Sequence, residues 1–108
     1  MALARESSGT QTCAIDTVHT LASPTGAAAR VLRLDFNHAA AGDVWEIYVE
    51  TQVLSGGTAR LQKLGTYSYR SEKIVETDPV TCIEGAAFKL QQTDGAGKDV
   101  PWEVCTLG

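Results

Sequence analysis

The stretch that decides the fold is residues 44–53, which read VWEIYVETQV. Every second residue is apolar or threonine, and between them lie Glu46, Tyr48, Glu50 and Gln52. Because successive side chains of a strand point to opposite faces, this alternation predicts a half-buried antiparallel strand. The SGGT sequence at 55–58 predicts a turn, since glycine accepts positive φ angles, and residues 59–69 are expected to return as the second strand of a hairpin.

The rest of the chain shows the same period of two in shorter pieces. We expect strands over residues 11–21, 30–36, 87–93 and 100–107, separated by turns at 23–26 and 94–98. Pro101 cannot donate a ladder hydrogen bond, so we expect the last strand to start there or to lie at a sheet edge. No helical apolar stripe is present, and at most one helical turn is expected, near residues 37–41.

These features predict an all-β protein, a single antiparallel β-sandwich or small jelly-roll-like barrel of about seven strands with an extended N-terminal arm. Residues 1–10 are small, polar and unpatterned, and they are predicted to form the flexible arm. Residues 11–108 are predicted to form the β-sandwich domain. The length of 108 residues suits one core and not comfortably two.

Charge and cysteine content narrow the class of protein. Nine Lys and Arg against thirteen Asp and Glu give a net charge of −4, and no basic cluster offers the footprint that nucleic acid needs. No apolar run resembles a signal peptide or a membrane span, so we expect synthesis in a cytoplasm and no membrane partner. Cys13, Cys82 and Cys105 lack CxxC spacing, which favours three free thiols, with a Cys82–Cys105 disulfide as the alternative.

No catalytic, cofactor or metal site is predicted. His19 and His38 lie in no recognisable nucleophile signature. Residues 95–98, GAGK, fail the phosphate-loop pattern at both ends. Asp94 and Asp99 flank this turn but are too few ligands for calcium, which takes six or more oxygens. We therefore expect that the chain is not an enzyme.

Tyr48 is a candidate contact residue, because it lies on the polar face of its strand between two glutamates. A ring with a polar tip suits a protein interface, although a cross-strand partner on a wet sheet face fits the pattern equally well. Trp45 and Trp102 fall on the apolar faces of their strands, so packing in the core is favoured over ligand stacking.

Two stretches of the chain resemble small virion proteins of tailed bacteriophages. They are residues 42–58, GDVWEIYVETQVLSGGT, and residues 88–104, FKLQQTDGAGKDVPWEV. In those relatives the second stretch typically reads as a Leu-(Lys/Gln)-Gln-Thr strand, a Gly-x-Gly-basic turn, and an aromatic or Pro-Trp strand. Asp99 here occupies a turn position that the relatives often fill differently.

The resemblance implies a non-enzymatic virion structural protein, a capsid decoration (cement) protein that bridges capsomers and stabilises the head. Its partners would be the major capsid protein or another virion protein, with the chain itself a homo-oligomer, of which a trimer is one form. Arg5, the only basic residue of residues 1–10, would dock with the arm on a neighbouring subunit, so deleting the arm should weaken capsid binding. The alternatives are a neck, tail or baseplate protein, or a carbohydrate-binding β-sandwich module of the host-attachment apparatus.

Overall fold

Strands dominate the chain, as its period-two alternation predicts. The computed structural model describes residues 3–53 and 56–107, and over those residues it contains nine strands and no helix. The strands are β1 (Leu3–Thr12), β2 (Val18–Ala22), β3 (Ala28–Asp35), β4 (Val44–Thr51), β5 (Arg60–Ser68), β6 (Ile74–Glu76), β7 (Val80–Cys82), β8 (Ala87–Asp94) and β9 (Asp99–Leu107).

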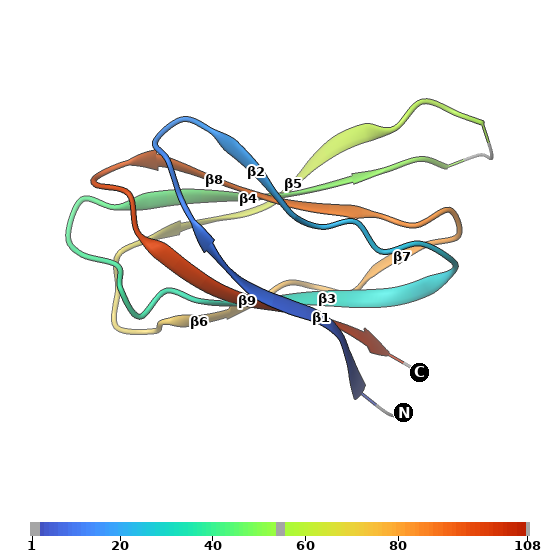
Figure 1. The fold of residues 1–108 in the computed structure, drawn as a ribbon, viewed down its shortest axis with the longest axis horizontal. Helices are drawn as coiled ribbons and strands as arrows, with labels where there is room; N and C mark the ends of the chain where they lie inside the picture. Colours follow the sequence, from blue (N-terminus) through green and yellow to red (C-terminus); the bar gives the residue numbers. More distant parts are fainter. Residues whose placement is uncertain (1–2, 54–55, 108) are drawn as a thin grey trace.

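The strands form two antiparallel sheets that pack face to face (Figure 1). The first sheet has the order β1-β9-β3-β6, and β7 pairs with the first half of β3. The second sheet has the order β2-β8-β4-β5. This arrangement confirms the predicted all-β fold class, an antiparallel β-sandwich.

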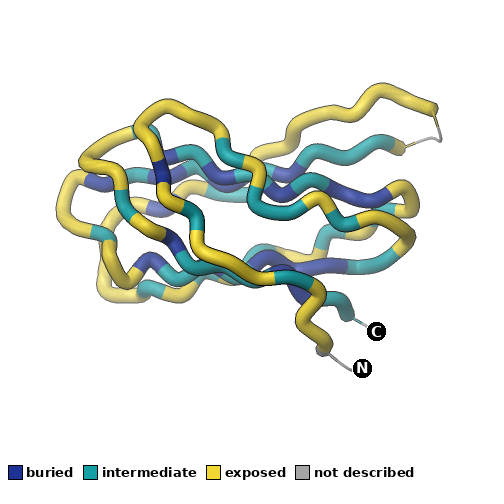
Figure 2. The backbone as a smooth tube through the Cα atoms, in the orientation of Figure 1, coloured by how far each residue is buried: buried dark blue, intermediate teal, exposed yellow. Residues whose placement is uncertain are grey.

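The core lies between the two sheets and is built from alternate residues of their central strands. Figure 2 shows buried residues recurring along these strands between more exposed ones. The predicted alternation in β4 is confirmed, because Trp45, Ile47 and Val49 are all buried. The other strands contribute Leu32, Leu34, Tyr67, Phe88, Leu90, Val100 and Val104, and Phe36 joins them directly after the end of β3.

Tyr67 joins this core to the loop that follows β5. Its ring stacks on Phe36 with 4.1 Å between the ring centroids, and its hydroxyl donates to the carbonyl oxygen of Glu72 at 2.9 Å. Tyr67→Phe keeps the stacking and removes the hydrogen bond, so we expect it to lower the free energy of unfolding by about 1 kcal/mol. Urea unfolding measures the change. A loss of about 3 kcal/mol or more, the size expected for removing a whole ring, would contradict this assignment.

The predicted strand over residues 11–21 is wrong in its middle. β1 ends at Thr12 and β2 begins at Val18, because residues 13–17 carry the chain from the first sheet to the second. Within this crossing Cys13 is buried and Asp16 takes a φ of 60°. A change of sheet leaves the period-two pattern on either side intact, which is why the pattern merged two strands into one.

β9 is an interior strand, contrary to the expectation that Pro101 would start the last strand or lie at a sheet edge. β9 begins at Asp99 and pairs with both β1 and β3. At Pro101 the strand pairs with Thr10 of β1, whereas pairing with β3 begins one residue later, at Trp102. One side of β9 is therefore unpaired at Pro101, so the missing N–H is accommodated there.

The part of the predicted N-terminal arm that the structure describes, residues 3–10, is extended but does not project freely. β1 runs along β9 from the Leu3–Leu107 pair to the Thr12–Asp99 pair, with an irregularity at Glu6. Residues 1 and 2 lie outside the described residues. So does Ser55 of the predicted 55–58 turn, in which Gly56 has a φ of 73°.

The remaining differences concern short features. β6 and β7 each span three residues and were not predicted, because a period of two cannot be recognised over so few positions. Residues 36–43 form two successive turns, closed by the Ala39 N–H to Phe36 carbonyl and Asp43 N–H to Ala40 carbonyl hydrogen bonds, each 3.0 Å long. Cys13, Cys82 and Cys105 are all free thiols, so the Cys82–Cys105 disulfide is not formed.

Candidate functional site

Tyr48 lies on the outer face of the second sheet, away from the core. β4 directs its even-numbered residues outward, since the residues that alternate with them are buried. β4 is flanked by β5 and β8, and Tyr48 therefore has Lys63 opposite it on one side and Lys89 opposite it on the other. The strand register thus surrounds a half-buried tyrosine with two cations.

The polar groups of this face are paired with one another. The Tyr48 hydroxyl donates to the Glu46 carboxylate, and Lys63 Nζ donates to the same carboxylate at 2.9 Å. Lys89 Nζ lies 3.7 Å from the Glu50 carboxylate. The hydrogen bond from Tyr48, followed by that from Lys63, lowers the pKa of Glu46, and the same Tyr48 bond raises the pKa of Tyr48. The Tyr48 hydroxyl therefore has a polar partner on its own strand, and that partner, Glu46, is bonded across to Lys63 of β5.

Tyr48→Phe is expected to raise the pKa of Glu46, because it removes a hydrogen bond that favours the carboxylate. A carboxyl group whose pKa is lowered on folding stabilises the fold above its ordinary pKa, about 4.3 for Glu. That stabilisation is lost as the pH falls through the folded-state pKa. The variant should therefore show a shallower fall in stability in acid than the parent chain.

An NMR titration of the Glu46 carboxyl measures this shift directly. Thr66 lies opposite Glu46 on β5 without a hydrogen bond to it, so Thr66→Ala is the matched control and should leave the pKa unchanged. An unaltered Glu46 pKa in Tyr48→Phe would show that the hydroxyl does not donate to this carboxylate.

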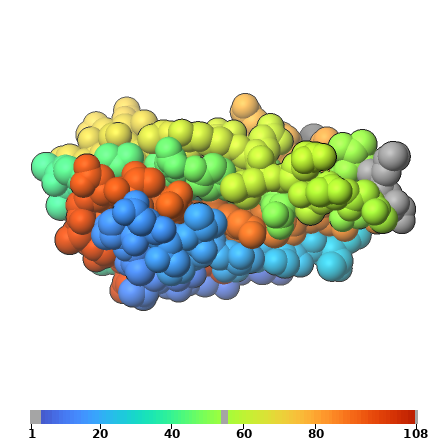
Figure 3. Space-filling view, turned by 90° about the horizontal axis from the view of Figure 1, so that it is seen from above, coloured from blue at the N-terminus to red at the C-terminus, as the bar shows by residue number. Residues whose placement is uncertain are grey.

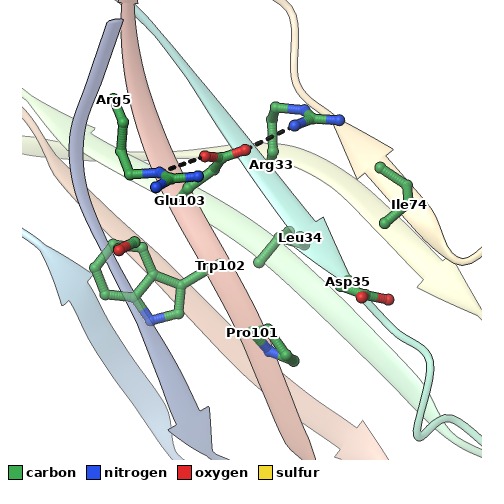
Figure 4. Close-up of a pocket in the computed structure, with 9 residues that line it drawn as sticks. Arg5, Arg33, Leu34, Asp35, Ile74, Pro101, Trp102 and Glu103 are labelled. Atoms are coloured by element: carbon green, nitrogen blue, oxygen red, sulfur yellow. Dashed lines mark hydrogen bonds and ion pairs between the residues drawn. The ribbon is translucent and has the colours of Figure 1, made fainter.

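Arg5 lies on the outer face of the first sheet, in a row of alternating charges (Figure 4). Arg5 Nε donates to one oxygen of Glu103 at 2.8 Å, and Arg33 Nη1 donates to the other at 2.6 Å. Arg33 Nε lies 3.3 Å from Glu76, so the row crosses β1, β9, β3 and β6. The hydrogen bonds from Arg5 and then Arg33 lower the pKa of Glu103. Arg5 thus ties the N-terminal strand to the rest of its sheet.

An open hollow of about 350 Å³ lies beside this row of charges. Its lining includes Arg5, Arg33 and Glu103, whose charges are already directed at one another, together with Ile74 and Trp102. The Trp102 indole packs over Gly9, where an added Cβ would lie 3.0 Å from the ring, and against the core. The hollow therefore offers a mixed polar and apolar surface rather than a free aromatic platform.

The structure does not bring Arg5 and Tyr48 together, since they lie on the outer faces of different sheets. The two histidines are also apart from both. His19 Nε2 accepts a hydrogen bond from the Ala14 N–H at 3.0 Å, and His38 is exposed in the turns between β3 and β4. Over residues 3–53 and 56–107, no group of three or more His, Cys, Asp or Glu side chains is placed to hold a metal ion.

A third surface, which the sequence interpretation missed, lies at the end of the sandwich where β4 and β5 run past their neighbours. β8 pairs with β4 only as far as Glu50, whereas β5 continues along β4 to the Thr51–Arg60 pair. The hairpin then extends beyond the body of the molecule (Figure 1). We call residues 51–53 and 56–64 the hairpin arm.

Apolar side chains are exposed at this end. Val53 of the hairpin arm is 90% exposed, Leu61 is 49% exposed, and Ile83, which follows β7, is 74% exposed. A hollow of about 310 Å³ is lined by arm residues, and another of about 350 Å³ lies between the arm and residues 78–81. The sequence does carry a feature that could have indicated this surface. Residues 51–65 contain two basic residues and no acidic one, in a chain with a net charge of −4.

Comparisons with protein-family models, with curated proteins and with solved structures each found no match. Since the described part of the chain is built of strands and loops, it offers no helix that could cross a membrane.

Proposed function

We propose that the chain is a non-enzymatic structural protein of a tailed-phage virion, a capsid decoration protein that bridges neighbouring capsomers and stabilises the head. One support is the resemblance of residues 42–58 and 88–104 to small virion proteins. These stretches contain β4 and most of β8 and β9, which are interior strands of the two sheets. The resemblance therefore falls on the segments that build the sandwich.

The observation that carries the proposal is the distribution of exposed apolar side chains. On both outer faces, charged side chains are largely paired with one another. By contrast, the two most exposed large apolar side chains among the described residues, Val53 and Ile83, both belong to the end that carries the hairpin arm. Exposed apolar groups gathered in one region favour contact with another protein. A bridging role needs such a contact surface and no reacting group.

A decoration protein works by adding contact area across the joints of a shell. Each copy contributes a modest interface, but a copy bound to one subunit is held at high effective concentration next to the neighbouring subunit. The second contact is therefore gained with little further loss of freedom, and a lattice of such bridges resists outward pressure. The partners on this proposal are the major capsid protein or another virion protein, and its location is the virion.

The test is the copy number of this chain in purified particles, measured by quantitative mass spectrometry against the major capsid protein. A number on the order of hundreds supports decoration, because a decoration protein repeats with the symmetry of the shell. About a dozen copies or fewer would overturn the decoration role and indicate a neck, tail or baseplate protein. Absence from particles would overturn the virion assignment.

A further inference from the structure

We propose that the hairpin arm docks against residues 78–84 of a second copy of this chain, and that the two copies contact each other reciprocally to form a dimer. The inference rests on the proposed contact function of this end of the sandwich and names its partner.

Beyond the Glu50–Leu61 pair, the described residues of the hairpin arm pair only with each other, because β8 stops pairing with β4 at Glu50. The hollow of about 310 Å³ is lined by arm residues alone. A two-stranded hairpin by itself is only marginally stable in water. Figure 3 shows this segment, in green and lime, forming one end of the molecular surface. A partner that covered Val53 and Leu61 would supply the missing packing.

Three of the charges at this end have no partner among the described residues. Among the described residues, four charged side chains have no hydrogen bond, ion pair or ring contact, and three of them are Arg60 on the arm and Asp78 and Glu84 beyond β6. The fourth, Asp16, lies in the crossing between β1 and β2. Elsewhere, the strand register brings opposite charges together. An end that keeps both signs unpaired is suited to pairing with another molecule.

The hairpin arm and residues 78–84 are complementary to each other. The arm carries Arg60 and Lys63 with no acidic residue, while residues 78–84 carry Asp78 and Glu84 with no basic residue. Both surfaces expose apolar side chains, and Ile83 is 74% exposed on the acidic one. Apolar groups beside charges of opposite sign give both affinity and a defined register. A second copy of the chain supplies the matching surface with no further assumption.

The two surfaces are also neighbours on the same molecule, which favours a reciprocal contact. Residues of the arm and residues 78–81 line one hollow of about 350 Å³ between them. A two-fold axis beside this hollow would place each arm on the acidic segment of the other copy, as a self-complementary interface requires. A stable interface needs roughly 800 Å² per partner, about a seventh of the 5806 Å² of accessible surface, so both surfaces must take part.

Sedimentation equilibrium over a series of protein concentrations tests the proposal. The parent chain should approach twice its monomer mass of 11.5 kDa. Arg60→Glu, and separately the double variant Asp78→Lys with Glu84→Lys, should each weaken self-association at least about tenfold, because like charges would then face each other in both contacts. These side chains are exposed, and circular dichroism verifies that each variant is folded.

Mixing the two variants is the decisive step. In a mixed dimer the Glu at 60 faces the two introduced lysines, and the unchanged Arg60 faces the unchanged acids, so both contacts regain opposite charges. The mixture should recover the mass and affinity of the parent chain. Val53→Asp should also weaken association, whereas Val18→Asp, at the opposite edge of the second sheet, is its matched control and should not.

A chain that stays monomeric at all concentrations, or variants that fail to complement on mixing, would overturn the inference. Particles distinguish this failure from failure of the proposed function. If the chain is monomeric but Arg60→Glu abolishes its incorporation into virions, the arm binds a different virion protein and the proposed function stands. If dimers form but the chain is missing from particles, the inference holds and the virion assignment fails.

Discussion

Glu6→Ala is expected to lower the free energy of unfolding by about 3 kcal/mol, because it leaves a buried cation without its carboxylate. The Arg30 side chain is only 3% exposed, and its Nε lies 2.7 Å from Glu6 Oε1. Arg30 Nη2 donates to the other Glu6 oxygen at 3.2 Å. Two carbonyl oxygens, of Thr25 and Gly26, accept the remaining hydrogen bonds of Arg30. These carbonyls keep the expected loss at the lower end of the range for a broken buried pair.

Arg5→Ala, one residue away, is the matched control. Its salt bridge to Glu103 is formed by a side chain that is 66% exposed, and exposed pairs contribute little to stability because solvent screens them. Chemical denaturation of the two variants side by side measures the contrast. Equal losses for the two variants would show that Arg30 does not depend on Glu6.

This contrast changes how the role of the N-terminal segment must be tested. Deleting residues 1–10 would remove Glu6 together with most of the nine residue pairs that join β1 to β9. Weaker capsid binding by such a deletion would then report a damaged fold rather than a lost docking arm. Arg5→Ala preserves the strand and tests the proposed contact of Arg5 alone.

The sandwich was predictable because its central strands carry local signals. β4 alternates buried apolar residues with more polar ones from Trp45 to Glu50, and the turn between β8 and β9 contains two glycines, of which Gly95 has a φ of 88°. The crossing at residues 13–17 was not predictable in this way, since a change of sheet leaves no mark on a period of two. Register and sheet order depend on contacts between distant segments, and single-strand patterns do not encode them.

The candidate surfaces also combine features that the sequence predicts with features that it does not. The outward position of Tyr48 follows from alternation alone, but its bond to Glu46 depends on rotamers that the sequence does not state. The Glu6–Arg30 pair was missed because the irregularity of β1 at Glu6 lets this side chain reach Arg30 across β9. The hairpin arm could have been noticed, because its lack of acidic residues is visible in the sequence alone.

Gly95→Ala is expected to destabilise the fold by about 3–5 kcal/mol, through its effect on a buried carboxylate. An added Cβ at Gly95 would lie 1.9 Å from Asp43 Oδ1 and 2.8 Å from Asp43 Cα, so both the side chain and the backbone at Asp43 would have to move. Asp43 is 2% exposed, and it accepts hydrogen bonds from the Ala40 N–H at 2.9 Å, the Ala96 N–H at 3.1 Å and Lys98 Nζ at 3.0 Å. Displacing the carboxylate breaks the link between the β3–β4 loop and the β8–β9 turn.

Asp43 also gives this prediction a dependence on pH. Burial alone would raise the pKa of Asp43, but the hydrogen bonds from Ala40, Lys98 and Ala96 outweigh it, so the pKa is lowered. The stabilisation from Asp43 is therefore complete above the ordinary Asp value of about 3.9 and is lost as the pH falls through the folded-state pKa. Since Gly95→Ala disrupts these hydrogen bonds, the difference in stability between variant and parent should shrink in acid.

Gly42→Ala separates backbone strain from the collision with Asp43. Gly42 has a φ of 94°, close to the 88° of Gly95, yet no atom lies within 4 Å of an added Cβ there. Its substitution should therefore cost only the conformational strain of a left-handed residue, about 1–2 kcal/mol. Thermal and urea unfolding of the two variants measure the gap between them. A gap close to zero would mean that the β8–β9 turn moves away from Asp43 without loss, and that the buried carboxylate does not hold the two loops together.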